Sequence, residues 1–255
     1  MQVHCQCGRA IDVESPFDQM VLSSNPFVRM RALCNHTQTG FVVLSPGYMS
    51  EVQFADPFEV PYTAFFTAIT ASIVVRELAL RPDGMTLLSS WARKEDAGCK
   101  KAVVVWLVFG LKGIDRVPSW RVHLSSAAAQ LGNRLYRPAL LDYAVSFETF
   151  VEAFLNRQLS ERYGDQVAEY VLKKTWHVEE RCKEVLRLAV GHSLTEDQDL
   201  WKAWKERVQE PRNDLAHGKP VVVGQAEAEQ AHQAVYQAIA WIQRLAPLRP
   251  EEALP

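Results

Sequence analysis

Most of the second half of this 255-residue chain is patterned for helices. Apolar side chains recur every three or four residues, which places them along one face of a helix. The segments with this period are approximately residues 137–160, 165–188, 198–209 and 225–245. The connectors between them are short, and the second segment is expected to bend near Trp176. We therefore predict an antiparallel α-helical bundle of four to five helices over residues 118–247, with residues 248–255 as a tail.

The first half, residues 1–117, mixes strand-like and helix-like patterns and is predicted to be a smaller α+β region. Residues 40–44 are typical of a strand. Residues 62–80 carry apolar side chains at helical spacing, and residues 83–94 are predicted to form another, shorter helix. The Val-rich run over residues 102–109 fits a buried strand or a buried helix, and periodicity does not separate the two.

Cysteine and histidine gather near the N-terminus in two short knuckles. Thiolate and imidazole ligands suit tetrahedral zinc, so we predict a zinc-ribbon-like module over about residues 1–50 with a structural zinc ion. The four predicted ligands are Cys5, Cys7, Cys34 and His36. His4 is an alternative for one of them. Both knuckles are tighter than the usual Cys-x-x-Cys spacing, so unmetallated surface turns with free thiols are the other interpretation.

Composition limits the classes of function. The formal net charge is −2, so the chain lacks the overall basic footprint of nucleic-acid enzymes. The sequence contains no P-loop, Gly-rich dinucleotide fingerprint, His-Glu-x-x-His or Gly-x-Ser-x-Gly motif. No apolar run reaches the roughly 20 residues of a membrane span. The odd number of cysteines, five, does not indicate a disulfide framework, so we expect a cytoplasmic protein without a membrane partner.

Residues 211–220 bring together side chains suited to phosphate chemistry between helix signals. Pro211 fits the first turn of a helix, and Gly218 fits the left-handed residue after its end. We predict a short helix with Arg212 near its start and His217 at its end. The alternative is a capped connector in which both side chains are structural.

Arginine followed five positions later by histidine also occurs at Arg31–His36 and at Arg187–His192, so the bare spacing is not specific. The fuller pattern Arg212-Asn213-x-x-x-His217-Gly218 resembles the HEPN family of all-helical domains, many of which are metal-independent endoribonucleases. The resemblance covers roughly residues 118–247. Residues 140–150 look like the core helix of that family.

The resemblance implies roles for three residues. His217 would be the general acid or base, Arg212 would stabilise charge, and Asn213 would orient His217 or a phosphate. Cleavage would need no metal and would leave a 2′,3′-cyclic phosphate and a 5′-hydroxyl. In that family, two such sites commonly face each other across a homodimer.

Two further features bear on this site. Glu148 falls inside the apolar stripe of its helix, and a buried carboxylate needs a partner. We predict that Glu148 contacts Arg212 or Asn213 and belongs to the site, the alternative being a salt bridge to another arginine. Substrate binding is assigned to a local basic patch that includes Lys219 and Arg207. The tryptophans that could stack on bases or pack in the core are Trp176, Trp201 and Trp204.

The preferred function is therefore a HEPN-type endoribonuclease, a toxin-like enzyme of defence or stress response. Its expected partners are RNA and a second copy of the chain, without DNA. The alternative is a non-catalytic HEPN protein that dimerises or binds nucleotides, with a protein partner held by its N-terminal region.

Overall fold

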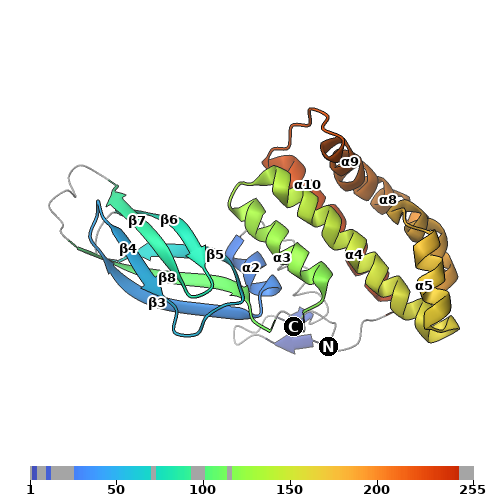
Figure 1. Ribbon diagram of the computed structural model, residues 1–255, viewed down its shortest axis with the longest axis horizontal. Helices are drawn as coiled ribbons and strands as arrows, with labels where there is room; N and C mark the ends of the chain where they lie inside the picture. The colour runs from blue at the N-terminus through green and yellow to red at the C-terminus, as the bar shows by residue number, and fades with distance from the viewer. Residues whose placement is uncertain are drawn as a thin grey trace. The chain divides into compact units, whose positions relative to one another are not determined.

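The computed structural model describes residues 2–4, 10–12, 26–69, 73–92, 101–113 and 117–246 (Figure 1). The chain divides into two compact units. One unit combines residues 1–26 with residues 117–254, and the other consists of residues 27–116. In the first unit, β1 (Gln2–His4) and β2 (Ala10–Asp12) form an antiparallel pair.

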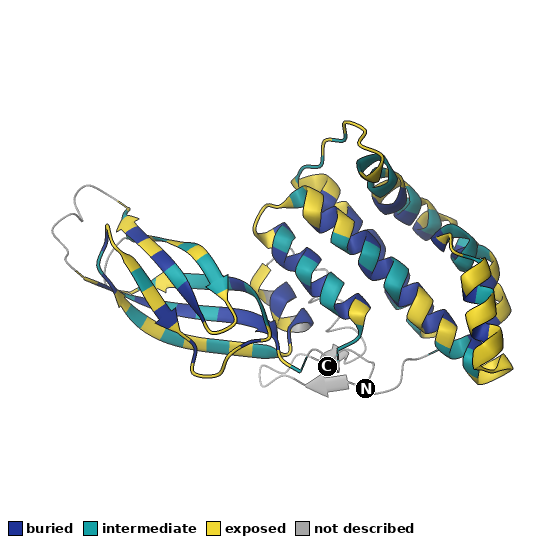
Figure 2. Cartoon of the chain, viewed as in Figure 1, coloured by how far each residue is buried: buried dark blue, intermediate teal, exposed yellow. Residues whose placement is uncertain are grey.

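The unit of residues 27–116 is a β-sandwich. Its elements are α2 (Pro26–Leu33), β3 (His36–Leu44), β4 (Met49–Gln53), β5 (Val60–Ala68), β6 (Ile73–Arg81), β7 (Gly84–Trp91) and β8 (Ala102–Leu111). They form two antiparallel sheets with strand orders β3-β8-β5 and β4-β7-β6. Leu44 and Trp106 from one sheet share a buried cluster with Met85 and Leu87 from the other. Along β3 the exposure of side chains alternates, as Figure 2 shows.

The predicted α+β fold of residues 1–117 is wrong in its helices. Within the segment 62–80, predicted as a helix, residues 62–68 belong to β5 and residues 73–80 to β6. The prediction relied on Phe65, Ile69 and Ile73, which are four residues apart. A spacing of four places side chains on one face of a helix and also on one face of a strand, so it does not distinguish them.

The helix predicted over residues 83–94 is also wrong, because β7 occupies residues 84–91. Arg81 pairs with Gly84, so Pro82 and Asp83 form a two-residue hairpin connection. A Pro-Asp-Gly sequence between apolar runs is a turn signal in its own right. A Cβ at Gly84 would lie 2.4 Å from the Val52 carbonyl oxygen, so only glycine lets β4 approach β7 here. The ambiguous run over residues 102–109 is β8, the central strand of its sheet.

The separate zinc-ribbon-like module over residues 1–50 is not present in the described part of the chain. The boundary between the two units falls near residue 26, inside the predicted module. Residues 36–44, which would belong to that module, pair with β8 from His36 to Leu44. The continuous ladder makes β3 part of the sandwich, and its Leu44 is buried in the core that the two sheets share.

The other unit is helical. Its helices are α3 (Ser119–Gly132), α4 (Tyr136–Tyr163), α5 (Asp165–Lys174), α6 (Val178–Glu180), η3 (Arg181–Val185), α7 (Leu186–Val190), η4 (Leu194–Glu196), α8 (Gln198–Trp204), η5 (Lys205–Gln209), α9 (Glu210–Ala216) and α10 (Gln225–Leu245). α4 is the central helix and contacts α3, α5 and α10. Figure 2 shows a buried stripe along α4. The stripe predicted from Leu140 to Leu155 is buried, and full burial of a Leu or Phe side chain contributes about 1.5–3 kcal/mol.

The number of helices, predicted as four to five, is too low for the described residues. The segment 165–188 is not one bent helix, because residues 175–177 separate α5 from α6. Arg181 stabilises this break by donating from Nε to the Thr175 carbonyl oxygen at 2.6 Å. Side-chain hydrogen bonds of this kind satisfy helix ends that periodicity alone does not reveal.

Candidate functional site

The Arg212–His217 segment lies at the end of a long helix. α8, the π-helical η5 and α9 follow one another without a break from Gln198 to Ala216. The separate short helix predicted to open at Pro211 is therefore wrong. Asp197 caps the actual start, where its side chain accepts a hydrogen bond from the Leu200 amide.

The π-helical turn explains how Pro211 is accommodated. Proline lacks an amide hydrogen and collides with the preceding turn of a regular α-helix. η5 lies directly before the turn that contains Pro211 and replaces the regular bonding pattern with wider π bonding. π-turns inside helices occur frequently at functional sites.

The end of this helix follows the prediction. Gly218 has a φ of 71°, in the left-handed region. The Gly218 amide donates to the Leu215 carbonyl, and the Lys219 amide donates to the Asp214 carbonyl at 2.9 Å. These two bonds form a Schellman motif, which fixes the backbone of His217 as the last residue before the turn.

The predicted contact between Glu148 and Arg212 is confirmed. Arg212 is on α9 and Glu148 is on α4, and Arg212 Nη2 lies 3.4 Å from Glu148 Oε1. Burial raises the pKa of the Glu148 carboxyl, while the positive charges of Arg212 and Arg181 act in the opposite direction. Glu148 is thus a partly buried carboxylate with a cation beside it, as its place in the apolar stripe required.

Asn213 contacts Arg212 rather than the ring of His217. Its Oδ1 accepts a hydrogen bond from Arg212 Nη1 at 3.1 Å, and its carbonyl accepts from the His217 amide. Arg212 is therefore held from two sides, by Glu148 and by Asn213. A guanidinium carries five N–H donors, so these contacts leave others for an anion.

These residues line one pocket of about 560 Å³, a volume within the usual range for small-molecule sites. The sequence-predicted residues in it are Glu148, Arg212, Asn213 and His217. The pocket also contains Trp176, for which base stacking and core packing were the two interpretations. The lining residues that the sequence did not predict are Thr149, Glu152, His177, Val178, Arg181 and Gln209. The pocket thus contains two imidazoles, two guanidinium groups and two carboxylates.

Arg181 is the most informative of the missed residues. Its Nη1 lies 2.8 Å from Glu152 Oε2. Glu152 follows Glu148 by one helical turn on α4, so the two carboxylates lie on the same side of that helix. That spacing was the signal available in the sequence: a second carboxylate at the edge of the stripe indicates a second cation opposite it. For His177, by contrast, no local pattern in the sequence links it to His217.

The two residues predicted to bind substrate lie elsewhere. Lys219 is exposed, and its Nζ pairs with Asp214 Oδ1 at 2.6 Å. Arg207 lines a different pocket, of about 590 Å³, together with Tyr236 and Arg244. Neither lines the pocket of Arg212 and His217.

The other Arg-x-x-x-x-His sequence of this unit differs in its surroundings. His192 Nδ1 lies 2.9 Å from Glu196 Oε2, and Arg187 lies 4.0 Å from the same carboxylate. Neither residue lines the Arg212 pocket. This pair is an internal comparison for the site.

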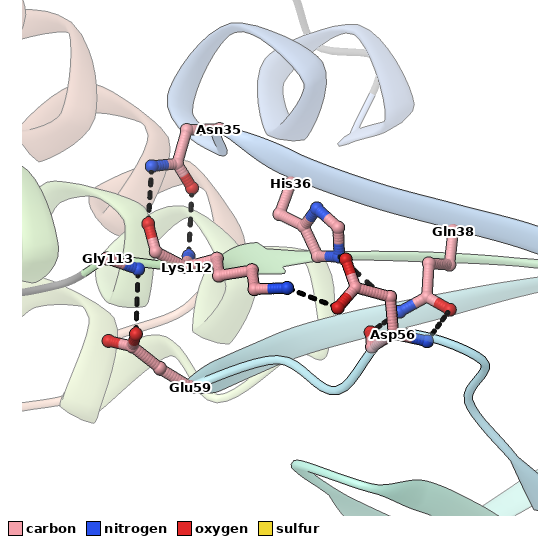
Figure 3. A network of polar contacts seen from close by, with 7 residues as sticks. All are labelled: Asn35, His36, Gln38, Asp56, Glu59, Lys112 and Gly113. Carbon is pink, nitrogen blue, oxygen red and sulfur yellow. Dashed lines mark hydrogen bonds and ion pairs between the residues drawn. The ribbon is translucent and has the colours of Figure 1, made fainter.

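Two of the predicted zinc ligands are described. Cys34 is buried after α2. The His36 ring lies 3.4 Å from Asp56 and packs edge-on against Phe58, in a polar network where Lys112 also pairs with Asp56 (Figure 3).

The Cys5 and Cys7 positions and the His4 side chain lie outside the described residues. Among the residues that the structure does describe, no group of three or more His, Cys, Asp or Glu side chains is placed to hold a metal ion. The zinc site stays a prediction.

Within the described ranges, none of the helices combines the length and the apolar character that crossing a membrane requires. No protein-family model, curated protein or solved structure matches this chain.

Proposed function

We propose that this protein is a metal-independent endoribonuclease of HEPN type, with its reaction centre in the Arg212–His217 pocket. The observation that carries the proposal is that Arg212, Asn213, His217 and Glu148 line one pocket with a second arginine, Arg181. This set contains a proton-transfer group and permanent cations, which RNA cleavage by its own 2′-hydroxyl requires.

In the proposed reaction, the 2′-oxygen attacks the adjacent phosphorus while its proton passes to a base. The bond from phosphorus to the 5′-oxygen breaks, and that oxygen receives a proton. The products are a 2′,3′-cyclic phosphate and a 5′-hydroxyl. His217 transfers protons in this scheme, and His177 is a second imidazole in the same pocket.

The two arginines would stabilise the negative charge that grows on the phosphoryl oxygens. A guanidinium is planar, always charged and matched to two phosphate oxygens. Both arginines already face carboxylates, Glu148 and Glu152. Burial raises the pKa of Glu148, and the positive charges of Arg212 and Arg181 oppose that shift.

The same ion pairs favour a second candidate, a non-catalytic protein that binds nucleotides through this pocket or dimerises. Cations already neutralised by carboxylates can hold a ligand without stabilising a transition state strongly. The two candidates differ in whether bound RNA is cut.

The deciding experiment incubates the purified chain with mixed RNA in EDTA. We expect cleavage to persist, with 5′-hydroxyl ends detected by kinase labelling. His217→Ala should lower the rate by about 10²–10⁴-fold, the range for a lost general acid or base. His192→Ala is the matched control, because it removes a histidine in the same sequence spacing outside the pocket, and it should leave the rate unchanged.

Equal cleavage by the wild type and His217→Ala would contradict the proposal. Loss of cleavage in EDTA, with the circular dichroism spectrum unchanged, would replace it with a metal-dependent mechanism. RNA binding without any cleavage would favour the non-catalytic candidate.

A further inference from the structure

Trp176 differs from the other tryptophans of its neighbourhood in being exposed. Its relative exposure is 73%, whereas Trp204 is buried at 1% and packs against Phe147 at a ring distance of 5.2 Å. The packing interpretation therefore holds for Trp204 and does not account for Trp176. Trp176 lines the pocket that also holds Arg212 and His217.

Hydrogen bonds from Arg181 hold the backbone next to Trp176 in place. Arg181 donates to the Thr175 carbonyl at 2.6 Å and to the Leu172 carbonyl at 3.2 Å. Val178, on the other side, is buried. The backbone that connects the two helices at Trp176 is therefore already ordered, so little backbone conformational entropy is lost at this connection when a ligand binds.

The ring of Trp176 already stacks on one side. Its centroid lies 3.8 Å from that of His177, with an angle of 32° between the planes. A stack of this kind orients the indole, and the high exposure of Trp176 leaves aromatic surface for another planar group. A nucleobase has such a face, whatever its identity.

We infer that Trp176 is a stacking platform for an unpaired nucleobase of an RNA strand whose phosphate lies at Arg212 and Arg181. The inference rests on the proposed function for the identity of the ligand and adds its class: single-stranded RNA, bound with little sequence preference. An aromatic face and paired guanidinium groups within one pocket match the two repeating parts of such a strand, base and phosphate. A base within a duplex is already stacked and paired, so duplex RNA should bind less well.

The test measures binding without cleavage. The probe is a fluorescent 2′-O-methyl RNA oligomer, which lacks the attacking hydroxyl, and binding is followed by fluorescence anisotropy. Trp176→Ala should weaken binding roughly tenfold, within the range measured for loss of one base stack. Trp176→Phe, which keeps an aromatic face, should retain most of the affinity. Tyr170→Ala is the matched control, since Tyr170 is also exposed, at 63%, and does not line the pocket.

A second probe of the same length and phosphate number, but without bases, separates stacking from a general loss of shape. The wild type and Trp176→Ala should bind it equally. Equal binding of the full probe by both chains, an equal loss for both probes, or no binding of the full probe by the wild type would each overturn the inference. Trp176-dependent binding in a chain that never cleaves RNA would refute the proposed nuclease and leave the inference standing.

Discussion

Glu148 and Glu152 are the residues on which the electrostatics of the pocket depend. They lie one turn apart on α4, and each faces one arginine. Glu152 is exposed at 59% of its side chain, whereas Glu148 is exposed at 29%. An exposed ion pair contributes little to stability because water and salt screen it, so the burial of Glu148 makes it the more consequential of the two.

The stability of the chain should depend on pH through Glu148. Burial raises the pKa of Glu148, so the folded chain binds its proton more tightly than the unfolded chain does. The stabilisation from this proton is fully present below the unfolded pKa of about 4.3 and is lost as pH rises through the folded pKa. Relative to Glu148→Gln, which cannot titrate, the wild type should lose free energy of unfolding over that window.

Urea unfolding of both chains at a series of pH values measures this difference, and titration of all other groups cancels in it. The opposite result would be a free energy of unfolding that rises for the wild type relative to Glu148→Gln as pH increases. It would mean that the ion pair with Arg212 outweighs the burial of the carboxyl.

At the scale of elements, the long helix from Gln198 to Ala216 carries the site, and Pro211 is its unusual residue. We expect Pro211→Ala to change the free energy of unfolding by less than about 1 kcal/mol. The gain in helix propensity opposes the larger entropy of the unfolded chain, and the π turn already accommodates the ring. Ala203→Pro, in the regular turns of α8, should cost about 3 kcal/mol. A gain of that size from Pro211→Ala would mean that proline strains the helix.

The turn after His217 allows a second test at this scale. Gly218 has a φ of 71°, and an added Cβ would meet no atom within 4 Å. Gly218→Ala should therefore cost about 1 kcal/mol through backbone strain alone, and Gly218→Asn should cost less because asparagine tolerates this conformation. Thermal unfolding of the three chains gives the ranking. An unchanged melting temperature for Gly218→Ala would show that the turn relaxes without cost, so that His217 is not held by it.

At the scale of the whole molecule, a single chain has no excess positive charge with which to attract RNA. The net charge is −2, and the two arginines of the pocket face two carboxylates. A two-fold dimer that brings two Arg212–His217 turns together would concentrate positive potential that one chain lacks. Exposed Lys219, whose Nζ pairs with Asp214, lies directly after that turn.

We therefore expect a dimer at micromolar concentration by light scattering, with specific activity that falls on dilution as the dimer dissociates. Lys219→Cys should form an intermolecular disulfide under mild oxidation more readily than the wild type or His192→Cys. A monomer with full activity would contradict the shared site and would leave the two imidazoles of one pocket as the acid and the base.

Some of this architecture was predictable from short stretches of sequence. The apolar stripe of α4 and the left-handed turn at Gly218 depend on residues within one or two helical turns, so local patterns determine them. That Glu148 needs a charged partner was also predictable, because a carboxylate inside an apolar stripe is costly to bury alone, and the partner is Arg212.

Tertiary structure decided the rest. Residues 62–80 carry a spacing that suits helix and strand alike, and pairing of β5 with β8 and of β6 with β7 selects the strand. Trp176 and His177 lie in the break at residues 175–177 and Arg181 follows it, and tertiary packing brings all three into one pocket with Arg212 and His217. The reason is physical: the sequence by itself specifies which faces must be buried and which turns are allowed, whereas contacts between distant residues depend on how those faces pack together.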